Sequence, residues 1–353
     1  MVDIGFLGCG FIARYHAMQL ALSPHHATVV ACHDADRSRA EGFSRELGKQ
    51  MGAPGTPVVC ETAEEVVERS SAVFVCTWTA SHLESVGVAS ARDVPVFCEK
   101  PLRVDLAQAR RVAGLLDELP VHAVGLVLRT SPAMHVVREL LREESVGAVM
   151  NVVFRDDQYL PVGGIYGSDW RADRVRAGSG TLLEHSIHDA DLLDWLVGPI
   201  ESVSATQGFF HGLDGIEDNV AAMGTLRSGG TFSLASVWHQ IHDRPSQRRV
   251  EVFCERALIC LEGDVSGPVS KTSDEQSLVL DGDQLTEWLA GRGVEVTSTE
   301  SDFLAAVGDL AAGRQPTPVI PGATQALRAH EIVDAMYESA ASEGRRVTLE
   351  PSR

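Results

Sequence analysis

The fold is decided by the first stretch of the chain, residues 2–13, which has the sequence VDIGFLGCGFIA. The short apolar run predicts a buried strand, and the residues after Ala13 have helical character. Between them, Gly8 permits a tight turn, Gly10 allows a close approach to the backbone, and Ala13 lets the helix pack on the strand. The N–H groups at the start of such a helix favour negative charge. This strand–turn–helix pattern predicts a loop that binds the pyrophosphate of a dinucleotide.

A second strand is expected at residues 28–33, and Asp34 follows it directly. A carboxylate at this place accepts hydrogen bonds from the adenosine ribose of NAD and repels the 2′-phosphate of NADP. Arg37 and Arg39 lie nearby in the sequence and would soften that repulsion. The plainer alternative is that Asp34 only caps the helix that begins near Ser38. We expect NAD as the cofactor, with NADP as the less favoured choice.

Composition limits the class of protein. A chain of 353 residues is too long for one ordinary core, which predicts two domains. The net charge of −19 argues against nucleic acid and anionic membranes as partners, because both bind basic surfaces. The seven cysteines form no C-x-x-C pair and fall mostly in apolar runs, which predicts buried free thiols. With no signal-peptide pattern and no apolar run of membrane-spanning length, we expect a cytoplasmic protein.

The order of strands and helices predicts an α/β protein. Residues 1–125 alternate strand and helix, which is typical of a Rossmann domain with a parallel sheet. Residues 126–353 are expected to form an α+β domain, with a large, mostly antiparallel, open-faced sheet that binds substrate and mediates oligomerisation. Its first strand is expected at residues 148–154. The C-terminal helices are candidates to pack back on the first domain.

The expected second sheet carries helices on one side only. Its other face is expected to present Val, Phe and Leu side chains together with Trp238. Left uncovered, these side chains would form a large exposed apolar patch, and such patches mark interfaces between proteins. We therefore expect a homo-oligomer, either a dimer or a tetramer.

Ligands of parallel sheets bind beyond the carboxyl ends of the strands. By this rule residues 8–12, Asp34, residues 77–82 and residues 99–101 converge on one crevice. Lys100 then lies where chemistry takes place, although a solvated surface lysine is the plainer alternative. The cofactor-binding residues predicted at this crevice are Gly8, Gly10, Phe11, Ile12, Asp34, Thr77, Trp78, His82, Glu99 and Lys100.

Several motifs together resemble the Gfo/Idh/MocA oxidoreductase family, which includes glucose–fructose oxidoreductase and inositol dehydrogenases. After the glycine loop, residues 77–82 (TWTASH) resemble the family's Thr-Pro-Asn-x-x-His loop, and residues 99–101 match its Glu-Lys-Pro signature. Residues 170–171 resemble its Trp-Arg pair. Residues 178–189 (GSGTLLEHSIHD) resemble its Gly-Gly-Gly-x-Leu-x-Asp-x-Gly-x-His helix. The resemblance implies an NAD-dependent oxidoreductase that acts on a ring secondary alcohol of a sugar, sugar acid or cyclitol.

Three residues depart from the family pattern. Trp78 replaces a proline and Thr79 an asparagine beside the cofactor, and Glu184 replaces the usual aspartate of the helix. The first two bear on the cofactor contacts, and the third adds one methylene to the reach of the carboxylate. Residues 155–180 are expected to form a long polar loop, and residues 155–171 within it are expected to decide specificity. The substrate-binding residues predicted are Arg155, Gln158, Tyr159, Trp170, Arg171 and His185.

A helix expected over residues 180–197 carries the candidate chemistry. Glu184 and His188 are four residues apart, so on one helix they share a face. Alcohol oxidation releases a hydride from carbon and a proton from oxygen, and histidine suits the base because its unperturbed pKa is about 6.5. Glu184 would orient the imidazole or stabilise its charged form, and Lys100 would donate to the same oxygen. The catalytic residues predicted are Lys100, His188 and Glu184.

Other functions were weighed against this one. Some proteins that resemble the family bind the cofactor as regulators without turnover, and loss of Lys100 or His188 would have favoured that class. A redox-assisted epimerase or eliminase with tightly held NAD is a further alternative. A metal site is not expected, because the order Glu-His-x-x-His at residues 184–188 matches neither zinc-helix motif. In addition, His185 would point about 100° away from Glu184 on a helix.

Overall fold

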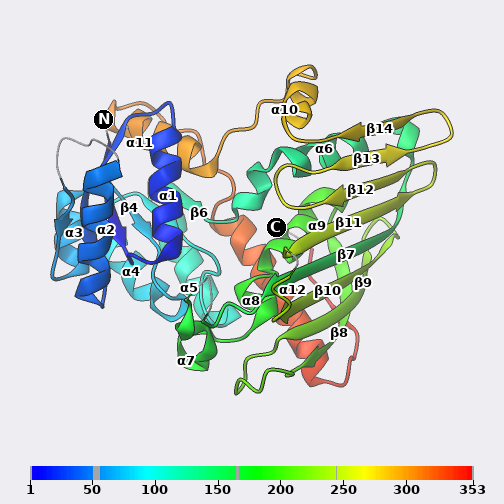
Figure 1. Ribbon diagram of the computed structural model, residues 1–353, viewed down its shortest axis with the longest axis horizontal. Helices are drawn as coiled ribbons and strands as arrows, with labels where there is room; N and C mark the ends of the chain where they lie inside the picture. Colours follow the sequence, from blue (N-terminus) through cyan, green and yellow to red (C-terminus); the bar gives the residue numbers. More distant parts are fainter. Residues whose placement is uncertain (1, 51–55, 164–166, 244, 352–353) are drawn as a thin grey trace. The chain divides into compact units, whose positions relative to one another are not determined.

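The computed structural model describes residues 2–50, 56–163, 167–243 and 245–351 (Figure 1). The chain divides into two compact units. The first runs to Val127 and also takes Thr297–Leu327, and the second holds Leu128–Val296 and the chain from Arg328 onward. A single division after residue 125 therefore misses a segment, because residues 297–327 belong with the first unit.

In the described part of the first unit, six parallel strands form one sheet in the order β3-β2-β1-β4-β5-β6. This order confirms the predicted Rossmann domain. The strands are β1 (Val2–Leu7), β2 (Ala27–His33), β3 (Val58–Val59), β4 (Ala72–Val75), β5 (Val96–Cys98) and β6 (His122–Val124). The helices are α1 (Phe11–Leu22), α2 (Arg37–Gln50), α3 (Ala63–Arg69), α4 (His82–Ser90), α5 (Leu106–Asp117) and α11 (Thr299–Ala311). Asp105 caps α5 as predicted, because its Oδ1 accepts from the Gln108 amide at 2.8 Å.

Stacked aromatic rings explain why residues 297–327 join the first unit. Phe6, Phe74 and Phe97 come from neighbouring strands, and their ring centroids lie 5.2 and 4.6 Å apart along the row. Phe303 of α11 meets Phe74 edge-on, with centroids 5.7 Å apart. All four rings are fully buried. Helix α11 therefore completes the core on one face of the sheet, and such aromatic pairs stabilise a core beyond the area they bury.

In the described part of the second unit, nine strands form a sheet in the order β14-β13-β12-β11-β7-β10-β9-β8-β15. All neighbours are antiparallel except β7 and β10, which confirms the mostly antiparallel prediction. The strands are β7 (Val149–Tyr159), β8 (Ile200–Gly208), β9 (Asn219–Leu226), β10 (Thr231–His239), β11 (Gln247–Cys254), β12 (Leu258–Glu262), β13 (Val269–Thr272), β14 (Ser277–Leu280) and β15 (Val347–Thr348). The helices are α6 (Pro132–Leu141), α7 (Arg174–Ala177), α8 (Thr181–Glu184), α9 (Ile187–Val197), α10 (Asp283–Ala290) and α12 (Ala323–Ala341).

Helices α6, α8, α9 and the later turns of α12 cover one face of this sheet with a continuous apolar core. Side chains alternate along the strands, so Val152 and Phe154 enter the core while Val153 points to the other face. That face also exposes Met223, Phe253 and Val279. The expectation for Trp238 is wrong, because its side chain is buried against Ala177 and Ile216.

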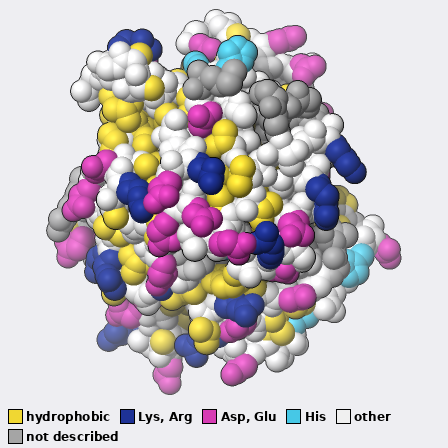
Figure 2. All heavy atoms as spheres, turned by 90° about the vertical axis from the view of Figure 1, so that its left-hand side faces the viewer, with side chains coloured by type: hydrophobic (Ala, Val, Ile, Leu, Met, Phe, Trp, Pro, Cys, Tyr) yellow, Lys and Arg dark blue, Asp and Glu magenta, His cyan; other side chains and the backbone are white. Residues whose placement is uncertain are grey.

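The surface carries mixed charge. On the face drawn in Figure 2, carboxylates and basic side chains are interspersed, and the coloured residues form no continuous basic area. In the part of the chain that the structure describes, no helix has the length and apolar character needed to cross a membrane.

Candidate active site

The glycine loop between β1 and α1 has the shape that a dinucleotide requires. Gly8 has φ of +91°, and a Cβ there would lie 2.5 Å from the carbonyl of Cys76, so only glycine fits. Gly10 differs, because a Cβ built on it meets nothing within 4 Å. The space beside Gly10 is therefore open for a ligand at the start of α1. Phe11 begins that helix with its ring 64% exposed, and Ile12 is half-buried.

Asp34 lies at the end of β2 and faces this loop. Its Oδ2 accepts from the Cys9 amide at 2.7 Å, and its Oδ1 accepts from the Asp36 amide at 2.9 Å. Each carboxylate oxygen has a second lone pair, so Asp34 can still accept from a ribose hydroxyl. The helix cap is instead Asp36, which binds the amide and hydroxyl of Ser38.

The two arginines that would soften repulsion of a 2′-phosphate are already paired. Arg37 binds Glu41 and Glu61, and Arg39 lies 3.6 Å from Asp36. These pairs are exposed, so each holds its partner weakly. The carboxylates of Glu41, Glu61 and Asp36 nevertheless balance the positive charge of the two arginines. Neither arginine therefore adds net positive charge near Asp34.

The loop after β4 contributes Thr77, Trp78 and His82. In the described residues, the buried Oγ1 of Thr77 has no hydrogen-bond partner, and Trp78 is half-buried. His82 is buried, with Nδ1 2.9 Å from the Pro101 carbonyl and Nε2 3.1 Å from the Thr77 carbonyl. Its ring therefore ties the Thr77 loop to the Lys100–Pro101 loop, and direct contact with the cofactor stays a prediction. A buried hydroxyl without a partner is consistent with a polar group supplied by a bound dinucleotide.

Glu99 and Lys100 follow β5, and Glu99 belongs to a buried cluster that sequence reasoning missed. Nε2 of His16 lies 2.8 Å from Glu99, and Nδ1 lies 2.7 Å from Glu300 of α11. Burial lowers the pKa of His16, but the hydrogen bonds to both carboxylates outweigh this effect and raise it to about 9. Burial raises the pKa of Glu99, and His16 with Lys100 lowers it overall. Lys100 itself is half-exposed, and its amide donates to Glu99.

The helix expected over residues 180–197 is broken. Helix α8 ends at Glu184 and α9 begins at Ile187, and the amides of His185 and Ser186 both donate to the Thr181 carbonyl. The Ser186 bond spans five residues, as in a π-bulge. Glu184 and His188 are therefore not one turn apart on a continuous helix.

Glu184 binds a residue that the sequence did not pair with it. Its buried carboxylate accepts from Nε of Arg171 at 3.0 Å, and the guanidinium of Arg171 stacks on Trp170 at 4.4 Å. His188 is buried in the first turn of α9. That Glu184 orients the His188 imidazole stays a prediction.

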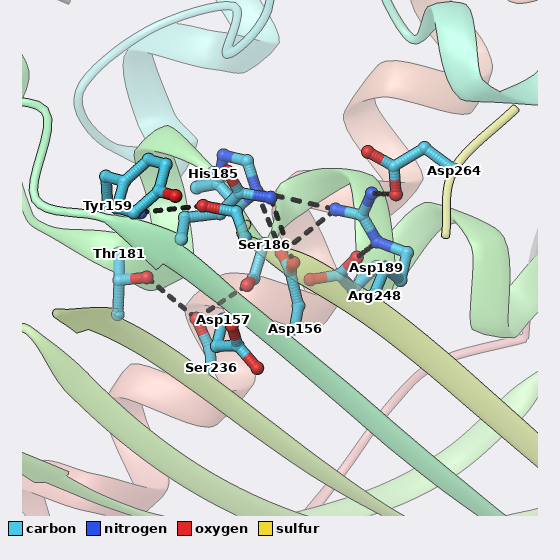
Figure 3. A network of polar contacts seen from close by, with 12 residues as sticks. Asp156, Asp157, Tyr159, Thr181, His185, Ser186, Asp189, Ser236, Arg248 and Asp264 are labelled. Carbon is cyan, nitrogen blue, oxygen red and sulfur yellow. Dashed lines mark hydrogen bonds and ion pairs between the residues drawn. The ribbon is translucent and has the colours of Figure 1, made fainter. Parts of the chain in front are cut away.

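His185 lies in a network of buried charges instead (Figure 3). Its Nε2 is 2.8 Å from Oδ2 of Asp156, whose side chain is fully buried. Arg248, only 1% exposed, binds Asp156 at 2.9 Å, Asp189 at 2.7 Å and also Asp264. Asp156, Asp189, Arg248 and Asp264 were not among the predicted site residues. Arg248 falls in the alternating pattern of β11, so only its burial in the fold distinguishes it from neighbouring arginines.

The structure separates the predicted substrate-binding residues. Strand β7 extends to Tyr159, so residues 155–159 are strand and not loop. Arg155 points away from Asp156, to the open face of the sheet, and pairs with Asp157. Gln158 shares the inner face and donates to Asp156 at 3.4 Å, whereas the Tyr159 ring meets His239. Part of the polar segment, residues 164–166, lies outside the described residues.

Three side chains that a metal site on this helix would use have other partners. Glu184 binds Arg171, His185 binds Asp156, and Asp191 forms two hydrogen bonds with Arg129, at 2.7 and 2.8 Å. Within the described ranges, no group of three His, Cys, Asp or Glu side chains is placed to hold a metal ion.

A Rossmann unit with open space at its glycine loop defines the class of dinucleotide-binding proteins. Residues 2–125 match the description "Oxidoreductase family, NAD-binding Rossmann fold", and residues 134–260 match "GFO/IDH/MocA C-terminal domain". The chain belongs to the Gfo/Idh/MocA oxidoreductase family, which confirms the resemblance, and its first unit is the NAD-binding domain.

Relatives named as enzymes are similar to this chain. A 1,5-anhydro-D-fructose reductase of Ensifer adhaerens is 28% identical over 242 residues, 68% of each chain. An inositol 2-dehydrogenase of Cereibacter sphaeroides (strain ATCC 17029 / ATH 2.4.9) is 38% identical over 205 residues, which span 57% of this chain and 55% of the relative. An inositol 2-dehydrogenase of Rhizobium meliloti is 25% identical over 99% of both chains. Levoglucosan dehydrogenase in complex with NADH and L-sorbose shares the fold, with TM-score 0.80, 20% identity and 99% coverage of both chains.

Proposed function

We propose that this protein is an NAD-dependent dehydrogenase that acts on a ring secondary alcohol of a sugar, sugar acid or cyclitol. The observation that carries the proposal is the open, glycine-lined loop beside Asp34, in an oxidoreductase chain that keeps both Lys100 and His188. The inositol dehydrogenases and the anhydrofructose reductase among its relatives support this substrate class. The presence of both Lys100 and His188 also argues against a regulator that binds the cofactor without turnover.

Different residues of the chain would bind the cofactor and act on the substrate. The loop at Gly8 and Gly10 with the N-terminus of α1 would hold the pyrophosphate, and Asp34 would hold the ribose. NAD, when bound, accepts or supplies a hydride. Lys100 would stabilise the negative charge that develops on a substrate oxygen, and His188 would serve as the base for the hydroxyl proton. Glu184, held by Arg171, would act as a fixed acceptor for a neighbouring substrate hydroxyl.

The test is turnover against a panel of inositols, hexoses, anhydro sugars and sugar acids, followed through NADH formation and, in reverse, NADH loss with the matching ketones. We expect at least one compound to support turnover, and Lys100→Met to reduce it while NAD still binds. Binding of NAD without turnover of any compound in either direction would overturn the proposal and favour a regulator. Exchange of configuration without net NADH would favour an epimerase.

We also propose that the protein is a homodimer or homotetramer formed through the open face of the second sheet. Val153, Met223, Phe253 and Val279 are exposed on that face, and together they supply apolar area that a second copy would cover. Light scattering at micromolar concentration is expected to show an oligomer. Met223→Glu places a charge on the face and is expected to shift the mass toward the monomer, and a monomeric wild type would contradict the proposal.

We also propose that the protein resides in the cytoplasm, which is a reducing compartment. It is supported by the cysteines, which are all free thiols, and all but Cys260 are buried. We expect a fluorescent fusion of the chain to distribute through the cytoplasm, and export of the fusion would contradict this placement.

A further inference from the structure

Arg14, in the first turn of α1, reaches back to the glycine loop that precedes this helix. Its Nη1 donates to the Cys9 carbonyl at 2.8 Å and to the Gly10 carbonyl at 3.0 Å. Side chains on a helix lean toward its N-terminus, so a long side chain at this position can return to the residues before the helix. Two consecutive carbonyls of the loop are therefore held by one positively charged group.

These two hydrogen bonds set the direction of two amides. A trans peptide is planar, and its N–H points away from its C=O. The Cys9 carbonyl shares a peptide with the Gly10 amide, and the Gly10 carbonyl shares one with the Phe11 amide. Because both carbonyls face the guanidinium, both amides point to the opposite side. A carbonyl that accepts from a cation also polarises its peptide, which makes the N–H a better donor.

The amides of Gly10 and Phe11 lie at the start of α1, where negative charge is favoured. The first amides of an α-helix have no partner within the helix. A Cβ built on Gly10 meets nothing within 4 Å, so the described residues leave space for a ligand there. The pyrophosphate of NAD carries negative charge on several oxygens that accept hydrogen bonds. The direction of these two amides therefore bears on how tightly the loop holds the cofactor.

The loop is anchored a second time, at the end of β2. Asp34 Oδ2 accepts from the Cys9 amide at 2.7 Å, and the Gly8 amide donates to the His33 carbonyl at 2.8 Å. Both backbone polar groups of Cys9 are thus held, its N–H by Asp34 and its C=O by Arg14. An ionised carboxylate cannot donate, so Asp34 cannot hold the carbonyls, and Arg14 has that role.

Arg14 is itself oriented by α2. Its Nε donates to Oε2 of Glu46 at 2.8 Å, and its guanidinium carbon lies 5.9 Å from the ring centroid of the buried Phe43. Phe43 and Glu46 are three residues apart and share one face of α2. The side chain of Arg14 is 37% exposed, and an ion pair this exposed stabilises a fold only slightly. These contacts fix the guanidinium against the loop.

We propose that Arg14 is a positioning residue for the cofactor, which holds the carbonyls of Cys9 and Gly10 so that the amides behind them bind the pyrophosphate of NAD. The inference rests on the cofactor site of the proposed function and requires no turnover. Arg14 then acts on every ligand that carries the pyrophosphate, whatever is attached to it. Glu46 acts only through Arg14.

The test measures by calorimetry how tightly NADH and ADP-ribose bind to Arg14→Gln, Arg14→Lys and a matched control. The control is Arg92→Gln, which breaks another ion pair of the first unit, also at 2.8 Å and with an arginine 39% exposed. We expect Arg14→Gln to weaken both ligands about tenfold and Arg92→Gln to match the wild type. Arg14→Lys should restore most of the loss, because one nitrogen serves both carbonyls.

Three results would overturn the proposal. The first is wild-type affinity of Arg14→Gln for both ligands. The second is a loss confined to NADH, because ADP-ribose keeps the pyrophosphate and lacks only the nicotinamide. The third is an Arg14→Lys variant that binds no better than Arg14→Gln.

A second measurement separates positioning from a general loss of stability. Glu46→Gln should weaken NADH less than Arg14→Gln does, and it should add no further loss in the double variant. Additive losses, or a lower melting temperature of Arg14→Gln with unchanged NADH affinity, would contradict the role of Arg14. The two failures differ, because a wild type that binds no NADH removes the proposed function, whereas tight binding by Arg14→Gln removes only this inference.

Discussion

Arg171 binds the buried Glu184 at 3.0 Å, a pairing that the sequence alone did not predict. The carboxylate is 1% exposed and the guanidinium 25% exposed. A charge buried this far is stable only while its partner stays in place. Arg171 is itself held flat on Trp170, so the pair fixes where Glu184 points.

Removing the guanidinium should therefore destabilise the second unit. We expect Arg171→Gln to lower the free energy of unfolding by about 3 kcal/mol, because an uncompensated carboxylate stays buried. Denaturant unfolding followed by circular dichroism measures this. The matched control is Arg345→Gln, which breaks an exposed pair with Glu338 and should change stability by less than about 0.5 kcal/mol. Equal effects of the two substitutions would show that Glu184 does not depend on Arg171.

The buried Glu99–His16–Glu300 cluster predicts a pH dependence of stability. The pKa of His16 is about 9 in the fold and about 6.5 when unfolded. The cluster therefore stabilises the protein fully below about pH 6.5, and this contribution, on the order of 3 kcal/mol, is lost as pH rises through about 9. Unfolding free energy measured from pH 6 to 10 should fall over this window. His16→Gln should be less stable at low pH and show a flatter profile, and identical slopes would contradict the assignment.

The two glycines of the loop should respond differently to substitution. Gly8→Ala forces a side chain into a positive φ and against the Cys76 carbonyl, so the loss of stability should exceed about 2 kcal/mol. Gly10→Val meets open space and should cost only about 1 kcal/mol at the helix cap. It should nevertheless weaken NAD binding about tenfold or more. Calorimetry with NADH and thermal unfolding separate the two effects, and unchanged NADH affinity in Gly10→Val would contradict the site.

Asp34 should decide between NAD and NADP. Asp34→Asn keeps an acceptor for the Cys9 amide but removes the charge that repels a 2′-phosphate. We expect the ratio of NADPH affinity to NADH affinity to rise about tenfold, because a loss of roughly 1.4 kcal/mol of repulsion changes an affinity tenfold. Asp36→Asn, which changes the helix cap, should leave the ratio unchanged. A wild type that prefers NADPH would contradict the assignment of NAD.

The first unit could be predicted because its signals are local. The strand–turn–helix pattern, Asp34 after β2 and the Asp105 cap depend on neighbours in sequence, and the structure shows the expected Rossmann sheet. Helix α11 could not be assigned in this way. Its place in the first core depends on Phe303 meeting Phe74, two residues far apart in the chain.

The site on the second unit was predicted only in part, because its form depends on contacts between residues that are far apart in the sequence. The pattern at residues 180–197 suits a continuous helix, yet the contacts of Thr181 and Ser186 with Ser236 on a distant strand break it. Once the helix is broken, the four-residue spacing of Glu184 and His188 no longer determines by itself how their side chains lie. Asp156 and Arg248 occupy ordinary inward positions of strands, so alternation alone predicts burial and not their pairing with His185.

The most direct test of the account follows a hydride from substrate to cofactor. A substrate from the panel, carrying deuterium at the carbon of its reacting hydroxyl, is incubated with the wild-type protein and NAD⁺. Mass spectrometry of the recovered NADH is expected to show the deuterium on the nicotinamide, with a slower rate than for the unlabelled alcohol. Deuterium that remains in the sugar or cyclitol, with no label in NADH for any compound of the panel, would contradict the claim that this chain is an NAD-dependent dehydrogenase.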